Sequence, residues 1–198
     1  MKVLWFIAGA LLVANSFIGC NGDNDASASD EASDTTATTK DEAEDSNDSA
    51  MVTRNAEKEA QFVVEVVASN YGEVKLARLG QQRASNSELK DVASVLEKEH
   101  EVVLNDIKSL ASRKGITVPT EENGDSKDKL KELTDEKSSL FDKEWCETLM
   151  DNHRTSITKF ENAEKDISDP DLKSFVTSVL PKLRTHHDRL MECHKKLK

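Results

Sequence analysis

Four ionisable residues occupy positions where the helical spacing of the sequence would otherwise place an apolar side chain. They are Glu73, His100, His153 and His186. Each lies in its own stretch of apolar residues that recur every three or four positions, the pattern of the inner face of a helix. A buried ionisable group without a partner is unfavourable, so we expect the four to contact one another. Three imidazoles and a carboxylate are ligands that Zn, Cu and Fe accept in proteins.

The positions of these residues also predict that they meet at one level. Residues that face each other across two antiparallel helices lie equally far from the connection between them. The midpoint between Glu73 and His100 falls at one predicted connection, and the midpoint between His153 and His186 falls at another. We therefore expect all four side chains near the middle of a helical bundle.

Glu97 is a further candidate ligand, because Glu97 and His100 form a Glu-x-x-His spacing on one helix face. A ferritin-type di-iron centre needs this spacing on two helices, together with further carboxylates. The residues three positions before the other two histidines are Met150 and Leu183. The sequence thus lacks the di-iron pattern, and any metal is a single transition metal ion such as Zn, Cu or Fe. The alternative is a metal-free core in which Glu73 hydrogen-bonds the imidazoles.

Four long helices are predicted to position these residues. Two of them cover about 57–83 and 85–114. The other two begin near 142 and at Asp169-Pro170, where Asp can cap and Pro can open a helix. Pro181 should kink the last of them. A short helix is expected over 126–137, and no strand pattern of useful length occurs. The prediction is an all-α domain over residues 56–198, a four-helix bundle.

The amino terminus has the features of a bacterial lipoprotein signal peptide over residues 1–20. Lys2 precedes an apolar run over 3–13, and Gly19-Cys20 follows at the expected cleavage site. Cys20 would carry the lipid and attach the protein to a membrane of the cell envelope, on the periplasmic side or at the outer membrane. An uncleaved membrane anchor or a secreted protein with an incidental Cys20 are the alternatives.

Residues 21–55 are predicted to be a disordered acidic tether. Residues 21–50 hold ten Asp or Glu and one Lys, which accounts for −9 of the net charge of −11. Such a segment cannot bury enough apolar surface to offset its ordering entropy. The remainder of the chain has no basic stripe or aromatic platform, so nucleic acid is not an expected partner.

Two cysteines remain once Cys20 is assigned to the lipid. Cys146 and Cys193 each lie seven residues from the histidine on their own helix, toward the same end of the bundle. Exported proteins permit disulfides, so a Cys146–Cys193 disulfide is predicted, with two free thiols as the alternative.

The sequence resembles a bacterial envelope family known as domain of unknown function 4142, whose members are often labelled predicted outer membrane proteins. The resemblance covers about residues 56–197 and implies a ferritin-like fold without an established activity. Asn152 stands where an acidic residue is common in that family, and both bundle cysteines are additions. The motifs that carry the resemblance are Glu73-Val74-Lys75-Leu76-Ala77, Glu99-His100, Gly115-Ile116-Thr117-Val118-Pro119, Phe141-Asp142, His153 and Leu180-Pro181-Lys182-Leu183-Arg184-Thr185-His186.

Two functions follow from these observations. The first is a non-enzymatic, lipid-anchored envelope module that binds an unknown protein partner or maintains the envelope, with a structural His–Glu cluster. The alternative is a periplasmic protein that binds a transition metal ion. No nucleophile–base arrangement, phosphate loop or nucleotide motif occurs, so an enzyme is not expected.

Overall fold

The computed structural model describes residues 38–197, and all secondary structure within this range is helical. The all-α prediction is therefore confirmed for this part of the chain. The predicted signal peptide, Cys20 and residues 21–37 of the predicted tether lie outside the described residues. None of the described helices has the length and apolar character needed to cross a membrane. The helices are α1 (Lys40–Ala50), α2 (Arg54–Arg83), α3 (Ser87–Lys114), α4 (Gly124–Asp135), α5 (Ser138–Asp166) and α6 (Pro170–His194).

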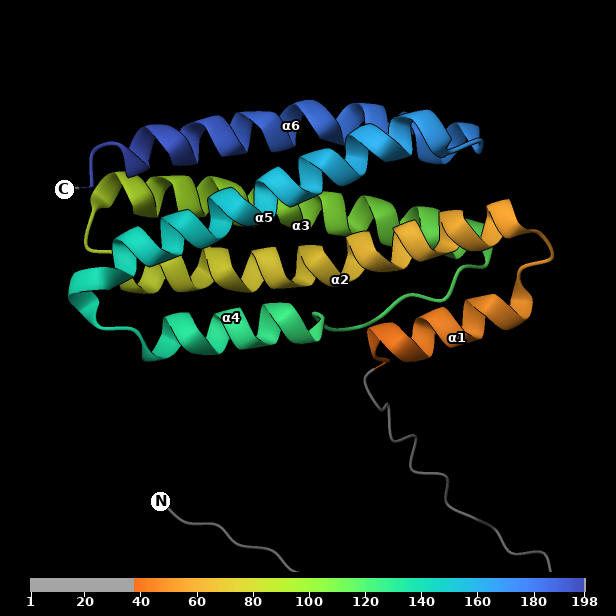
Figure 1. Ribbon diagram of the computed structural model, residues 1–198, viewed down its shortest axis with the longest axis horizontal. Helices are drawn as coiled ribbons and strands as arrows, with labels where there is room; N and C mark the ends of the chain where they lie inside the picture. The colour runs from red at the N-terminus through yellow and green to blue at the C-terminus, as the bar shows by residue number, and fades with distance from the viewer. Residues whose placement is uncertain (1–37, 198) are drawn as a thin grey trace, which may run out of the picture. The chain divides into compact units, whose positions relative to one another are not determined.

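The four long helices surround a shared core (Figure 1). Short connections join α2 to α3 and α5 to α6, and each of these pairs packs closely. Contacts of α2 with α5 and of α3 with α6 close the arrangement. The two short helices α1 and α4 both pack on α2 (Figure 1). Because neighbours cover α2 on several sides, it buries residues around most of its circumference.

Helix ends follow the sequence signals with small shifts. Asp169 caps α6 by accepting from the backbone N–H of Leu172, and Pro170 opens the helix. Gly115 ends α3 with a left-handed φ of 66°, which glycine adopts without steric cost. Asp142 does not start α5 as predicted, since its carboxylate accepts from the backbone N–H groups of Ser85 and Asn86. The helix begins one turn earlier, at Ser138.

The prediction of a disordered tether over residues 21–55 is wrong for residues 40–50, which form α1. Thr39 and Glu42 form a capping box at its start. Ala43 is fully buried. The side-chain amide of Asn47 makes two hydrogen bonds of 2.9 Å with the backbone N–H and C=O of Thr117. A few specific contacts therefore hold a segment whose overall composition is that of a disordered chain.

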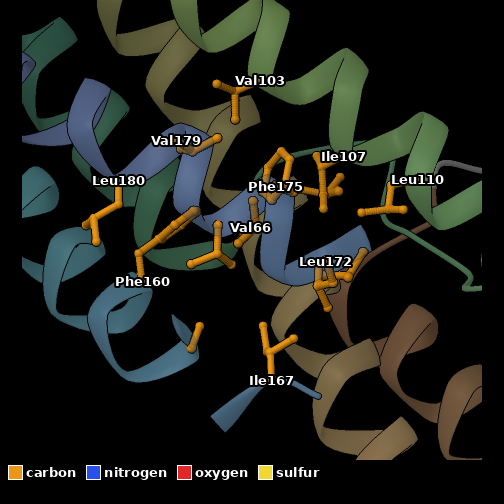
Figure 2. Close-up of a cluster of buried hydrophobic side chains, with 14 of the residues drawn as sticks. Val66, Val103, Ile107, Leu110, Phe160, Ile167, Leu172, Phe175, Val179 and Leu180 are labelled. Atoms are coloured by element: carbon orange, nitrogen blue, oxygen red, sulfur yellow. The ribbon is translucent and has the colours of Figure 1, made fainter. Parts of the chain in front are cut away.

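The buried apolar side chains form two clusters that flank the level of the four predicted polar residues. We call them the Phe160 cluster, part of which is drawn in Figure 2, and the Trp145 cluster. From α2, the Phe160 cluster takes Val63, Val66 and Val67, whereas the Trp145 cluster takes Leu76, Ala77 and Leu79. Glu73 lies between these two stretches. The core is thus two apolar regions separated by one polar layer.

Replacement of Gly80 by Ala should destabilise the Trp145 cluster. A Cβ atom at Gly80 would lie 2.5 Å from ring carbons of Trp145, which is fully buried and donates a hydrogen bond to the Leu76 carbonyl. We expect Gly80→Ala to lower the free energy of unfolding by about 1–3 kcal/mol, the usual range for overpacking. Urea unfolding measures this. Gly124→Ala is the control, because a Cβ there meets nothing within 4 Å; an equal loss in both variants would contradict the prediction.

Asp169, which caps α6, should make the stability of the fold sensitive to acid. Burial alone would raise the pKa of Asp169, but the hydrogen bonds from Lys114 Nζ and the Leu172 N–H hold it below its ordinary value of 3.8. A lowered folded-state pKa stabilises the fold above the unfolded-state pKa, and this stabilisation is lost as the pH falls through the folded-state pKa. Asp169→Asn should therefore flatten the loss of stability below about pH 4. Thermal unfolding between pH 2.5 and 6 tests this, with the more exposed Asp171→Asn as control.

Candidate metal centre

The four predicted residues meet in the polar layer, one from each long helix. His100, His153 and His186 are only 3%, 1% and 2% exposed. The Nε2 atom of His153 lies 3.3 Å from His100 Nε2 and 3.4 Å from His186 Nδ1. One ring nitrogen from each histidine lies within 4.8 Å of the others. The prediction that these side chains share one level is confirmed.

The outward nitrogens of His153 and His186 both face hydrogen-bond acceptors. His153 Nδ1 lies 2.8 Å from the carbonyl oxygen of Leu149, one turn earlier on α5. His186 Nε2 lies 2.9 Å from a carboxylate oxygen of Glu99 on α3. A carbonyl and a carboxylate only accept, so each outward nitrogen carries the proton of a neutral ring. His153 Nε2 and His186 Nδ1 are then unprotonated, with lone pairs directed inward.

His100 also carries its proton on the outward nitrogen. Its Nδ1 lies 2.9 Å from Oδ1 of Asn70. The amide orientation of Asn70 is fixed, because its Nδ2 donates to the Val66 carbonyl at 2.8 Å. Asn70 Oδ1 therefore accepts from His100 Nδ1, and His100 Nε2 carries a lone pair. All three histidines direct unprotonated nitrogens toward one another.

Protonation of His100 or His186 is a poor way to relieve this arrangement near neutral pH. Burial lowers the pKa of His100 well below its ordinary 6.5, and the nearby His153 and His186 lower it further. Burial and His153 lower the pKa of His186 to about 4, although Glu99 opposes the shift. A bound cation is the other way to satisfy inward lone pairs.

The spacing of the nitrogens fits a metal ion. With metal–nitrogen bonds of about 2.0–2.1 Å, two ligands of a tetrahedral ion lie about 3.3 Å apart. The separations of 3.3 and 3.4 Å from His153 to the other two histidines match this value, and the third pair lies within 4.8 Å. Histidines that bind metals usually donate their other N–H to a carboxylate, a carbonyl or another polar group, which all three do here.

Glu73 lies beside this cluster. Its Oε1 accepts from Nδ2 of Asn152 at 2.8 Å. Its Oε2 lies 3.8 Å from His153 Nδ1 and 4.0 Å from His100 Nε2. Within residues 38–197, this oxygen is the one buried side-chain nitrogen or oxygen without a hydrogen-bond partner. Burial raises the pKa of Glu73, an effect that His153 and Asn152 partly offset.

The structure does not place Glu97, the fifth predicted ligand, at the cluster. Its carboxylate accepts from Arg78 Nε and from Gln81 Nε2, both on α2 and both at 2.6 Å. The Glu-x-x-His spacing identifies a shared helix face, but the side chain of Glu97 turns toward α2. Glu99, adjacent to His100, instead reaches across to α6.

The predicted disulfide is not formed. Cys146 and Cys193 are both free and buried, and Cys146 Sγ donates to the carbonyl oxygen of Leu190 at 3.2 Å. Burial raises the pKa of the Cys146 thiol to about 12, with further contributions from Cys193 and Glu147. Both cysteines belong to the Trp145 cluster, as their equal spacing from the histidines suggested, but the disulfide predicted between them is wrong and the alternative of two free thiols holds.

Comparison with known proteins assigns the chain to a family. Residues 27–192 match a family described as "Domain of unknown function (DUF4142)", so the chain belongs to that family. The match includes α1, in agreement with its place in the folded part of the chain. Neither a curated protein nor a solved structure gives a significant match.

The proton assignments can be measured directly. At pH 7.5, His100 and His153 should carry their proton on Nδ1 and His186 on Nε2, because those nitrogens face the acceptors. Long-range ¹H–¹⁵N NMR of the imidazoles distinguishes the two tautomers. Asn70→Leu removes the acceptor of His100 Nδ1–H, so His100 should also populate the Nε2–H tautomer, while the tautomer of His153 should not change. An Nε2–H form for both His100 and His153 in the unmutated chain would refute the assignment.

Proposed function

We propose that this member of the DUF4142 family holds one transition metal ion through His100 Nε2, His153 Nε2 and His186 Nδ1. One observation supports this most strongly: a nitrogen of each ring faces the other rings in the core while the outward nitrogens face acceptors, which in neutral rings leaves the inward nitrogens unprotonated. From the sequence alone, an interaction module ranks ahead of metal binding. The arrangement of the nitrogens reverses that order.

A metal-free polar core accounts for these contacts less well. Each contact between two imidazoles would need a proton between their nitrogens, and each neutral ring has only one proton. That proton already points outward to Asn70, Leu149 or Glu99. Two lone pairs at 3.3 Å repel, and burial intensifies the repulsion by removing solvent screening. A cation at the centre converts this repulsion into three bonds.

The donor set favours one ion over a cluster. Imidazole nitrogens suit Zn, Cu and Fe, whereas a di-iron centre needs several bridging carboxylates. Glu73 is the only carboxylate buried beside the three histidines among the described residues. The pairing of α2 with α3 and of α5 with α6 also supports a four-helix, ferritin-like bundle, without the ferroxidase ligands.

We further propose that the protein is a lipid-anchored protein of the bacterial cell envelope, with lipid on Cys20. The apolar run over 3–13 and the Gly19-Cys20 pair support this assignment. The role is holding or buffering a metal rather than catalysis, since the histidines are at most 3% exposed and substrates of ordinary size cannot reach them. The three-histidine core would then serve as a metal store attached to a membrane.

Metal analysis of the full-length chain, purified without a histidine tag, tests the proposal. After incubation with Zn²⁺ and removal of excess metal, we expect about one Zn per chain. His153→Ala should weaken binding at least tenfold, because it removes the central ligand. His187→Ala and His194→Ala are matched controls outside the cluster; His194 pairs with Glu147 instead.

Circular dichroism of each variant separates ligand loss from unfolding. Zn far below one per chain, or equal weakening in the folded control variants, would contradict metal binding at this cluster. Cu²⁺ and Fe²⁺ in place of Zn²⁺ rank the metals under the same conditions.

A further inference from the structure

A small cavity borders the histidine cluster on the side of the Phe160 cluster. All four long helices contribute to its walls, and its volume of about 20 Å³ has room for about one water molecule. Its polar lining comes from Ser69, Asn70, Glu73, His100, Ser156, Lys182 and His186, and its apolar lining from Val103, Phe160, Val179 and Leu183. His100 and His186 thus belong both to the proposed site and to this cavity wall.

Glu73 is placed beside the proposed ion rather than on it. Glu73 Oε2 lies 4.0 Å from His100 Nε2, beyond hydrogen-bond distance. Its nearest nitrogen on His153 is Nδ1, which faces away from the cluster. The other carboxylate oxygen is held by Asn152. Glu73 Oε2 is therefore a buried acceptor without a donor, next to a cavity the size of one water.

We infer that the metal ion keeps a fourth coordination position open to this cavity, where a water molecule binds the metal and donates a hydrogen bond to Glu73 Oε2. This inference rests on the proposed function. The water satisfies both the free coordination position and the unpartnered oxygen. Three protein ligands with a water in the fourth position are usual where zinc stays accessible to a small ligand. Only ligands of about two or three atoms, such as a small monovalent anion, can replace this water.

Azide titration of the Co²⁺-loaded full-length chain tests the inference, because the visible spectrum of Co²⁺ reports a change of ligand. Azide should shift the spectrum of the unmutated protein. Glu73→Gln should keep one Co²⁺ per chain and bind azide several-fold more tightly, since the amide removes a negative charge and can donate to the anion.

A cavity-filling variant provides the second arm. Val179→Ile adds a methyl group to the cavity wall and should weaken azide binding at least tenfold with unchanged Co²⁺ content. Val102→Ile is the matched control, because Val102 is 51% exposed and does not line the cavity. It should behave like the unmutated protein.

The possible failures are distinguishable. One Co²⁺ per chain with no spectral response to azide would overturn the open position and leave metal binding intact. Loss of Co²⁺ in folded Glu73→Gln would make Glu73 a ligand and overturn its role as acceptor of the water. Absence of Co²⁺ and Zn²⁺ binding by the unmutated chain would overturn the proposed function itself, and this inference with it.

Discussion

A neutral imidazole has one proton, and the direction in which it donates that proton determines what the other nitrogen can do. In this core, Asn70, Leu149 and Glu99 take the three protons outward, so three lone pairs are left pointing inward. Packing on both sides prevents the rings from moving apart, since the Phe160 and Trp145 clusters lie immediately above and below the polar layer along the helices. The apolar core therefore maintains a close contact of three imidazoles that, with all three rings neutral, would be unfavourable without a cation.

The position of α2 is central to this arrangement, because α2 carries both Glu73 and Asn70. Helices α1 and α4 both pack on it, and α4 also contacts α5 and contributes Leu133 to the Trp145 cluster. Gly72, next to Glu73, leaves no room for a Cβ because Ser126 of α4 lies against it. The two short helices thus fix the helix that supplies the carboxylate and one proton acceptor.

Helical periodicity predicted the long helices and placed the four polar residues at one level, because both depend on spacing along the chain. It did not predict α1, in which only Ala43 and Asn47 are buried and the composition remains acidic. It also missed Asn70, Glu99 and Asn152 as partners of the cluster. Each lies within one turn of a predicted residue, but whether a polar side chain turns inward depends on the neighbouring helix, which spacing does not describe. Glu97, for example, turns toward Arg78 of α2, whereas Glu99 turns toward His186 of α6.

On the proposed function, the depth of the cluster favours holding a metal over processing a substrate. All three histidines are almost completely buried, and of the residues that accept their protons, Glu99 has a side chain that is 44% exposed. On the proposed function, a metal ion can therefore leave only when helices separate locally, which requires part of the packing on either side to open. Glu99 and His186 join α3 to α6 at the exposed edge of the site, so this contact is the one where solvent can first compete. A site closed in this way favours slow exchange and retention of the ion over turnover.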